Sequence, residues 1–523
     1  MSAFKNLRES VEYLERKGQL RRVKEEIDPH LEMAEIQRRV YAAGGPALLF
    51  TRVKGTEFPC VSNLFGTRER AWMLFGEGVE RARKLLKLRS DPVEALRHPF
   101  DSLRSGFGAL HALPRSVSSP AVAAHETRLS ALPQITSWPK DGGPFITLPL
   151  VYTEHPDMPG VWNSNLGMYR IQLAGGEFQA DREAGLHYQI HRGIGVHHHA
   201  AIRRGERLKV SIFVGGSPAH MLAAVMPLPE GIAEVLFAGI LGGRGFRYTR
   251  QNGHLLSADA DFCITGTIDP LRTLPEGPFG DHLGYYSLAH PFPVLTVKKV
   301  YHRSGAIWPF TVVGRPPQED ATLAELIHEI AGDALPKEIP GLHAVHAVEA
   351  AGVHPLLLAI ASDRYAPYEE HKPRELHTIG HALLGYGQLS LAKYLWLTAR
   401  ESDSMPDIRD VSAFFRHVLR RVSWERDLHF ITRTTMDTLD YSGAGLNEGS
   451  KLLLAVSGSP RRTLAEEIPQ ALLKLWPDNW SAPKLVLPGV LTFSGSSSGG
   501  KGAEPEVLDE ELEGFSRRWG NQL

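Results

Sequence analysis

Residues 261–302 read DFCITGTIDPLRTLPEGPFGDHLGYYSLAHPFPVLTVKKVYH, two β-prone runs joined by a turn rich in glycine and proline. The runs at 261–269 and 292–302 are dense in β-branched and aromatic residues, which favour strands. Two more runs of this kind are FITLPLVYT at 145–153 and LKVSIFVGG at 208–216. Short strands separated by Gly and Pro turns predict a β-barrel or a β-sandwich in the middle of the chain.

The turn between the first two runs carries two acids, Glu276 and Asp281. Gly277, Pro278 and Gly280 give a tight backbone that fits neither a helix interior nor a central strand. Carboxyls on opposite arms of such a turn can converge on one point, which pushes their pKa values apart and suits proton transfer. The competing interpretation is a solvated turn with two capping acids.

The first 50 residues have an α/β pattern. Apolar residues recur at spacings of three and four from residue 4 to 14, which predicts an amphipathic helix that Gly18 can end. Residues 19–27 resemble a strand, Asp28-Pro29 opens a second helix, and PALLF at 46–50 is typical of a short buried strand.

Changes of composition mark the remaining segments. The stretch 109–134 is rich in Pro, Ser and Ala without a sustained period, which indicates a connection. Beyond residue 311, a helical stretch at 323–332 and apolar strands at 394–397 and 451–456 predict a third domain of α/β type. SGSSSGGKGAEPEV at 494–507 predicts a flexible linker before a charged tail.

Length and charge narrow the class of protein. The 523 residues suit about three domains, and a net charge of -1 gives no field that favours nucleic acid or anionic lipid. Cys60 and Cys263 are too few for a disulfide framework or a thiolate zinc site, which suits a reducing compartment. The start of the sequence lacks an apolar signal core, and no apolar run is long enough to span a bilayer. We therefore expect a cytoplasmic protein with a small-molecule partner.

Several common catalytic motifs are absent from the sequence. It contains no HExxH pair, Walker lysine loop or GxSxG elbow, and GGRGF at 242–246 lacks the context of a dinucleotide fingerprint. The three consecutive histidines at 197–199 would alternate in direction on a strand, so we expect no shared metal there.

Another candidate set consists of Asn165, Arg170, His187 and Glu234. An amide, a carboxylate and an imidazole suit Mn²⁺ or Mg²⁺ bridged to a phosphate. Each residue also has a structural interpretation: Asn165 could shape a turn, His187 could be a core histidine, and Glu234 could lie on a solvated helix face.

Five ordered motifs carry a resemblance to a known family. They are LRESVEYLERKGQLRRVKEEIDPHLEMAEI at 7–36, NLGMYR at 165–170, PEGIAEVLFAGIL at 229–241, EGPFGDHLGYYS at 276–287 and GRPPQED at 314–320. With these motifs the chain resembles the UbiD family of prenylated-flavin-dependent decarboxylases along almost its whole length. Five ordered motifs of this complexity are highly specific, although each alone would be weak.

The resemblance implies an α+β multidomain fold. It implies an N-terminal α/β domain over residues 1–115 and a split β-barrel that binds prenylated FMN over 116–310. A C-terminal α/β domain over 311–490 would mediate oligomerisation, to a homodimer or a hexamer, and 491–523 would be linker and tail.

The resemblance also implies a cofactor site. Asn165, His187 and Glu234 would hold Mn²⁺ against the phosphate of prenylated FMN, with His191 as a competing choice for the imidazole. A potassium ion would lie near Ala223, Ala224 and Met226. The residues implied in cofactor binding are Asn165, Leu166, Gly167, Met168, Tyr169, Arg170, His187, Arg192, Gly193, Glu234 and Lys393.

Arg170, Glu276 and Asp281 match the family's catalytic trio. Loss of CO₂ from an sp² carbon needs an electron sink, which the family supplies as the modified flavin. Arg170 would orient the substrate carboxylate, and Glu276 would hold the guanidinium. Asp281 would protonate the carbon, with its pKa raised by burial beside Glu276.

The chain departs from parts of the family pattern. Asp281 is shorter than the Glu of ferulic acid decarboxylases and resembles the Asp of the polyprenyl-hydroxybenzoate branch, which weakens inference of a cinnamate-type substrate. TARESDSMPD at 398–407 stands where many relatives have a run of aspartates, so a subfamily-specific shape is expected there.

The resemblance implies a reversible decarboxylase of an aromatic, heteroaromatic or α,β-unsaturated acid, with a flavin prenyltransferase as cofactor supplier. A physiological carboxylase with the same site is one alternative, and a non-catalytic flavin- or metal-binding assembly subunit is another. A metal hydrolase built on the histidine-rich stretch is a remote third.

Overall fold

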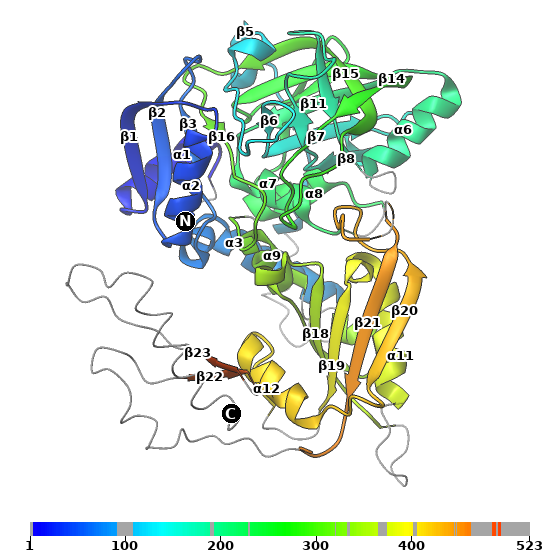
Figure 1. The fold of residues 1–523 in the computed structure, drawn as a ribbon. Coiled ribbons are helices and arrows are strands. Elements are labelled where there is room, and N and C mark those ends of the chain that lie inside the picture. Colours follow the sequence, from blue (N-terminus) through cyan, green and yellow to red (C-terminus); the bar gives the residue numbers. More distant parts are fainter. Residues whose placement is uncertain are drawn as a thin grey trace, which may run out of the picture.

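The computed structural model describes most of the chain. The described residues are 4–90, 108–188, 193–228, 231–319, 321–331, 335–364, 374–400, 405–443, 445, 447–461, 484–487 and 490–492. Three bodies are visible: an N-terminal and a central domain lie side by side, and a C-terminal sheet lies below them (Figure 1). The mixed helices and sheets confirm the predicted α+β multidomain fold.

The N-terminal domain is a four-stranded sheet with helices packed against it. The order is β1-β2-β3-β16, and the elements are α1 (Leu7–Arg16), β1 (Leu20–Ile27), α2 (Glu32–Ala42), β2 (Ala47–Val53), β3 (Cys60–Ser62) and β16 (Trp308–Pro309). The Asn6 side chain caps α1 by accepting the N–H of Glu9, and Leu7, Val11 and Leu14 are buried. The predicted helices and strands of the first 50 residues are thus present.

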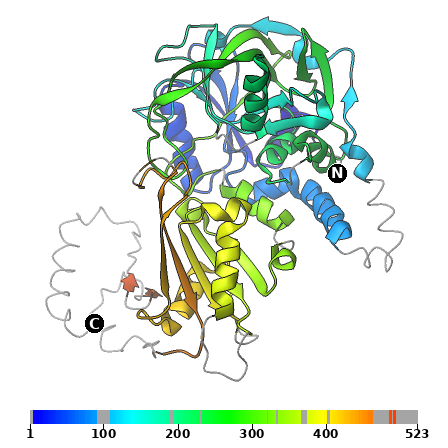
Figure 2. The same ribbon diagram turned by 90° about the vertical axis from the view of Figure 1, so that its right-hand side faces the viewer.

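Two long-range features tie this domain to the rest of the chain. Strand β16 comes from far along the sequence and pairs parallel with β3, so the first sheet is completed by residues 308–309. Helix α3 (Arg68–Ser90) leaves the domain and packs against α8 (Glu234–Gly242) and α9 (Ala321–Ala331). This helix lies between the upper domains and the C-terminal sheet (Figure 2).

The central domain is built on a nine-stranded sheet. Its path is β6-β9-β10-β15-β14-β11-β7-β8, and β5 pairs with β15. The strands are β5 (His125–Thr127), β6 (Phe145–Ile146), β7 (Pro149–Glu154), β8 (Ser164–Gly167), β9 (Ile171–Gln172), β10 (Glu183–Leu186), β11 (Leu208–Val214), β14 (Phe262–Glu276) and β15 (His290–His302). Strands β14 and β15 are antiparallel from the pair Phe262 and His302 to the pair Glu276 and His290, which confirms the predicted strand, turn and strand.

Smaller elements surround this sheet. They are η1 (Leu110–Ala112), β4 (Arg115–Ser116), η2 (Ala121–Ala123), η3 (Leu129–Ala131), η4 (Val161–Asn163), α6 (Gly193–Arg204), α7 (Pro218–Val225), α8, β12 (Arg247–Gln251) and β13 (His254–Ser257). The three consecutive histidines lie in helix α6, so the expectation of a strand there is wrong. His197 instead contacts Thr153 at 2.8 Å, and His198 contacts the Tyr188 hydroxyl.

The C-terminal domain is a five-stranded sheet with helices on both faces. The order is β17-β18-β19-β21-β20, with β17 (Leu342–Ala347), β18 (Leu356–Ala361), β19 (Tyr394–Ala399), β20 (Leu428–Thr434) and β21 (Gly449–Val456). The other elements are α9, α10 (Leu335–Glu338), η5 (Glu349–Ala351), α11 (Arg374–Gly385), η6 (Gly387–Leu391), α12 (Val411–Arg421), β22 (Lys484–Leu487) and β23 (Val490–Thr492).

Side chains of β18 alternate between the two faces of this sheet. Leu357 packs in a core with Ile379 of α11, and Leu358 packs in a second core with Phe414 of α12. The predicted third α/β domain is therefore present, whereas the predicted linker at 494–507 lies outside the described residues. Among the helices that the structure describes, none has the length and apolar character needed to cross a bilayer.

Candidate active site

Arg170 is ion-paired to both acids of the 276–281 turn. Its Nε and Nη2 donate to the Oε1 and Oε2 of Glu276 at 2.9 and 2.8 Å, and its Nη1 donates to Asp281 Oδ2 at 2.5 Å. Glu276 is fully buried and Asp281 is 5% exposed. The two carboxyls do converge on one point, and the solvated-turn interpretation is wrong.

Hydrogen bonds fix the backbone of this turn. Gly277, whose φ is +93°, donates its N–H to Gln172 Oε1 at 2.8 Å, and Gly280 donates to Asp141 Oδ1 at 2.8 Å. The hydroxyl of Ser287 accepts from Phe279 N and from Arg170 Nη2, both at 3.0 Å. The acids are therefore held by a rigid loop rather than by a mobile one.

The pKa values of the two acids move in the same direction. Burial alone would raise the pKa of Glu276, but hydrogen bonds from His187 and Arg170 outweigh it and lower that pKa to about 2. Burial also acts to raise the pKa of Asp281, yet the His282 hydrogen bond and the Arg170 charge hold it below its usual range. The expectation of a raised pKa for Asp281 is thus wrong for the structure in which Asp281 is paired with Arg170.

His187 lies with Arg170, Glu276 and Asp281. Its Nδ1 is 3.1 Å from Glu276 Oε2, and its ring stacks on Phe292 with centroids 3.9 Å apart. Burial lowers the pKa of His187 below its usual range, which favours the neutral ring. His187 therefore supports Glu276 in this structure, and His191, the competing residue, lies outside the described residues.

Asn165 and Glu234 form a second polar group in the same cavity. Glu234 is the first residue of α8, and its Oε2 accepts the N–H of Leu166 at 2.8 Å. The Nδ2 of Asn165 is buried with no partner among the described residues. A Cβ on Gly193 would lie 2.1 Å from Asn165 Oδ1, so only glycine leaves room for that side chain. Burial raises the pKa of Glu234 above its usual range.

A large cavity joins these two groups. Its volume is about 2160 Å³, and it is lined by Asn165, Arg170, His187, Glu234 and Asp281 together with residues of the C-terminal domain. The other residues that were implied in cofactor or potassium binding and that line it are Leu166, Gly167, Met168, Tyr169, Gly193, Ala224 and Met226.

Of the implied cofactor residues that the structure describes, Lys393 does not line this cavity. Arg192 lies outside the described residues. Lys393, just before β19, donates to Asp440 Oδ2 at 3.1 Å and to Ser442 Oγ at 2.5 Å. It therefore supports the connection between β20 and β21 in this structure.

Sequence reasoning missed residues that the C-terminal domain brings to the site. Tyr441 lies in the connection between β20 and β21, and its pKa is raised to about 12 by burial and by the charge of Asp281. Leu439 of the same connection lines the cavity. Their position shortly before the predicted apolar strand at 451–456 was the available signal.

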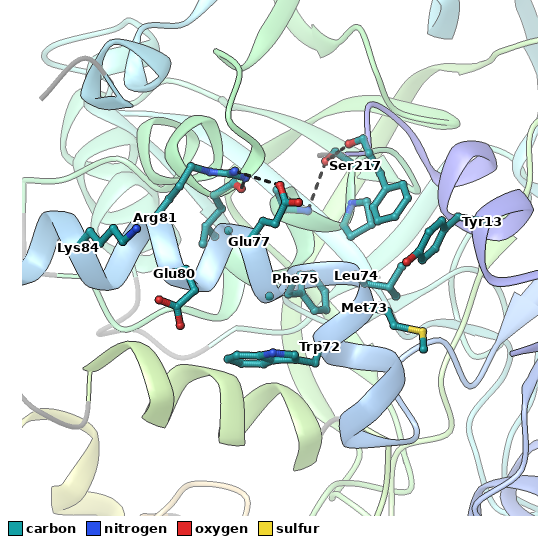
Figure 3. A pocket seen from close by; sticks show the side chains of 16 residues that line it. Tyr13, Trp72, Met73, Leu74, Phe75, Glu77, Glu80, Arg81, Lys84 and Ser217 are labelled. Carbon is teal, nitrogen blue, oxygen red and sulfur yellow. Dashed lines mark hydrogen bonds and ion pairs between the residues drawn. The ribbon is translucent and has the colours of Figure 1, made fainter. Parts of the chain in front are cut away.

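A smaller cavity of about 570 Å³ lies beside α3, lined by Tyr13, Trp72, Phe75 and Ser217 (Figure 3). Its charged residues are Glu77, Glu80, Arg81 and Lys84, and Arg81 Nη1 lies 3.6 Å from Glu77 Oε2. Arg170 and Asp281 line the larger cavity, and Glu276 is buried behind Arg170 as its ion-pair partner, so this cavity is the candidate active site.

The fold and the site define a multidomain α+β enzyme with an arginine and two buried carboxylates beside a large cavity. Three domain profiles match this chain, all described as 3-octaprenyl-4-hydroxybenzoate carboxy-lyase: the N-terminal domain at 11–89, the Rift-related domain at 115–316 and the C-terminal domain at 321–456. The chain therefore belongs to the UbiD family of carboxy-lyases.

Individual relatives agree with this assignment. A Chlamydia pneumoniae protein named as a subunit of 4-hydroxybenzoate decarboxylase is 40% identical over 465 residues, 88% of this chain and 76% of the relative. The closed form of vanillic acid decarboxylase from Sedimentibacter hydroxybenzoicus matches with a TM-score of 0.74 at 21% identity, over 98% of this chain and 99% of that chain.

A second solved structure carries a cofactor. It is an evolved dimeric form of the UbiD-class enzyme HmfF from Pelotomaculum thermopropionicum in complex with prFMN, with a TM-score of 0.67 at 23% identity over 90% of this chain and 98% of that chain. At these identities the structural matches establish the shared fold.

Proposed function

We propose that this chain is a reversible non-oxidative decarboxylase of an aromatic, heteroaromatic or α,β-unsaturated carboxylic acid, with Arg170, Glu276 and Asp281 as catalytic residues. The observation that carries the proposal is the ion pairing of Arg170, a largely buried residue that lines the large cavity, with both acids. Aromatic acids are the first substrates to test, because a relative is named as a subunit of 4-hydroxybenzoate decarboxylase.

The residues present fit prenylated FMN and its metal. The unpartnered amide Nδ2 of Asn165 and the buried carboxylate of Glu234 offer a donor and oxygen ligands that suit Mn²⁺ beside a phosphate. Either His191 or His187 would supply the imidazole, and K⁺ would lie near Ala223, Ala224 and Met226. When bound, prenylated FMN supplies the electron sink that decarboxylation at an sp² carbon requires.

Arg170 would bind and orient the substrate carboxylate. Four of its hydrogen bonds are to Glu276, Asp281 and Ser287, so a bound carboxylate competes with Asp281 for Nη1. Glu276 keeps its two hydrogen bonds and holds the guanidinium plane in place.

Asp281 would act as the proton donor once Arg170 has been taken by substrate. Separation from the guanidinium removes one cause that lowers its pKa, and burial, which acts to raise that pKa, is then opposed chiefly by the His282 hydrogen bond. As the C–C bond breaks and CO₂ leaves, the proton on Asp281 passes to the vacated carbon. The same residue would accept a proton in the carboxylation direction, which mass action selects.

The test is reconstitution by co-expression with a flavin prenyltransferase. Purified protein is incubated with a panel of acids that includes 4-hydroxybenzoate, and CO₂ release and deuterium entry at the vacated carbon are followed. A non-catalytic assembly subunit would show neither. Sedimentation of the same sample distinguishes a homodimer from a hexamer.

A further inference from the structure

A cluster of two histidines and an aspartate lies where the C-terminal domain meets the 276–281 turn, which we call the catalytic turn because it carries Glu276 and Asp281. His282 directly follows Asp281, His354 lies in the connection from β17 to β18, and Asp437 lies in the connection from β20 to β21. One ligand atom from each of the three side chains lies within 4.8 Å of the other two. His354 Nδ1 is 2.7 Å from Asp437 Oδ2, and His282 Nε2 is 4.0 Å from the same oxygen.

We propose that His282, His354 and Asp437 bind a divalent transition-metal ion of the class represented by Zn²⁺, which joins the C-terminal domain to the catalytic turn. Two imidazoles and a carboxylate are a ligand set that such ions take in proteins, with a position left for water. Ligand atoms around tetrahedral zinc lie about 3.3 Å apart. The ion therefore needs the His354–Asp437 pair, at 2.7 Å, to open by about half an ångström, and His282 Nε2, at 4.0 Å, to approach Asp437 Oδ2 by about 0.7 Å.

The backbone presents each ligand toward the others. Asp437 Oδ1 accepts the N–H of Leu439 at 3.0 Å, which leaves Oδ2 facing the histidines. Gly352, with φ of +87°, turns the chain just before His354, and a Cβ on it would lie 2.7 Å from Leu283 Cδ2. The turn that carries His354 and the loop that carries His282 are therefore in contact without the ion.

His282 connects this cluster to the catalytic acid. Its Nδ1 is 3.5 Å from Asp281 Oδ1. An ion on Nε2 leaves the ring proton on Nδ1, where it can be donated to that oxygen, as in other carboxylate–histidine–metal arrangements. The ion would thus hold Asp281 in position, and His282 and His354 line the large cavity through which it can enter.

Zn²⁺ titration of the full chain, purified without flavin and treated with a chelator, tests the proposal. Competition with a chromophoric chelator gives the affinity, and the visible spectrum of the Co²⁺ form reports nitrogen and oxygen ligands. We expect one Zn²⁺ per chain, with binding weakened at least about 10-fold in His354→Gln. Zn²⁺ binding should persist in Glu234→Gln, because Glu234 belongs to the proposed manganese site and not to this cluster.

His346→Gln is a matched control. His346 is buried and lies 3.6 Å from an acid, Glu349, but it belongs to no part of the cluster. Its Zn²⁺ affinity should equal that of the wild type. Equal affinity in His354→Gln, or no stoichiometric binding by the wild type, would overturn the proposal.

A measurement on the wild type alone avoids dependence on variant folding. Zn²⁺ should raise the unfolding temperature of the chelator-treated wild type and of Glu234→Gln, because a ligand that binds the folded state stabilises it. No shift in either protein would also overturn the site. Because flavin is absent throughout, failure here leaves the proposed decarboxylase function intact.

Discussion

Glu276 accepts two hydrogen bonds from the guanidinium of Arg170, at 2.9 Å from Nε to Oε1 and at 2.8 Å from Nη2 to Oε2. One edge of the planar guanidinium, Nε and Nη2, meets both oxygens of one carboxylate, so the group cannot rotate without losing a charged hydrogen bond. The third nitrogen, Nη1, points at Asp281 and is where a substrate carboxylate would compete. A bound substrate would therefore leave the hydrogen bonds between Arg170 and Glu276 in place and would replace Asp281 as the partner of Nη1.

Asp281→Asn should lower kcat by about 10²- to 10⁴-fold, because an amide cannot deliver the proton to the vacated carbon. The readout is deuterium entry at that carbon together with product release, measured in reconstituted protein. Asp281→Glu is the control, since it keeps an acid and should retain more activity. Wild-type turnover in Asp281→Asn would assign the proton to another group.

The kcat of decarboxylation should fall as pH rises. Asp281 must be protonated in the substrate complex, where displacement from Arg170 removes one of the causes that lower its pKa, so the acid form is lost as pH rises through that pKa. The fall in kcat should therefore lie at higher pH than the pKa of Asp281 in the free protein, which the His282 hydrogen bond and the Arg170 charge hold below its usual range. A kcat that is level or rises through this range would contradict the donor role.

Acid should remove the stability that Glu276 contributes. Its pKa is 4.5 as a free group and about 2 in the fold, so its contribution is fully present above pH 4.5 and is lost as pH falls toward 2. A shift of this size corresponds to about 3 kcal/mol. Urea unfolding of wild type and Glu276→Gln should therefore differ most above pH 4.5 and converge near pH 2, and a constant difference would contradict the linkage.

Local sequence determined some features of the fold and site. The run at 261–302 forms strand, turn and strand because β-branched residues flank a Gly and Pro turn, and Glu276 and Asp281 converge because that turn is short. The three consecutive histidines fold as a helix against expectation, since nothing local separates a short buried strand from a buried helix there. Strand β16 is two residues long and has no local pattern.

Long-range contacts explain what the sequence did not predict. The lowered pKa of Asp281 depends first on the hydrogen bond from its neighbour His282 and then on the charge of Arg170, and Arg170 is 111 residues away, so no pattern around the turn reveals it. Residues from the C-terminal domain such as Tyr441 and His354 reach the catalytic turn only through domain packing. Their chemistry was visible in the sequence, but their partners were not.

Glu319 explains why the GRPPQED segment stabilises the fold. It is 1% exposed, and its carboxylate accepts N–H groups of Asn63 at 3.1 Å and Phe65 at 2.9 Å and the side chain of Gln37 at 3.1 Å. Glu319→Gln should lower the free energy of unfolding by about 1–3 kcal/mol, because an NH₂ group then faces buried donors. Glu325→Gln, a partly exposed position on α9, should change it by less than about 0.5 kcal/mol.

Two variants, His187→Gln and His191→Gln, should show which histidine supports Glu276 and which one binds manganese. His187 is engaged by Glu276 at 3.1 Å and by the ring of Phe292, so its loss should lower kcat and leave manganese bound. Loss of His191 should instead lower the manganese content of reconstituted protein, measured by mass spectrometry of the metal, with Asn165→Ala as a positive control for loss. Manganese that disappears only in His187→Gln would make His187 the ligand and would require its ring to leave Glu276 when the cofactor binds.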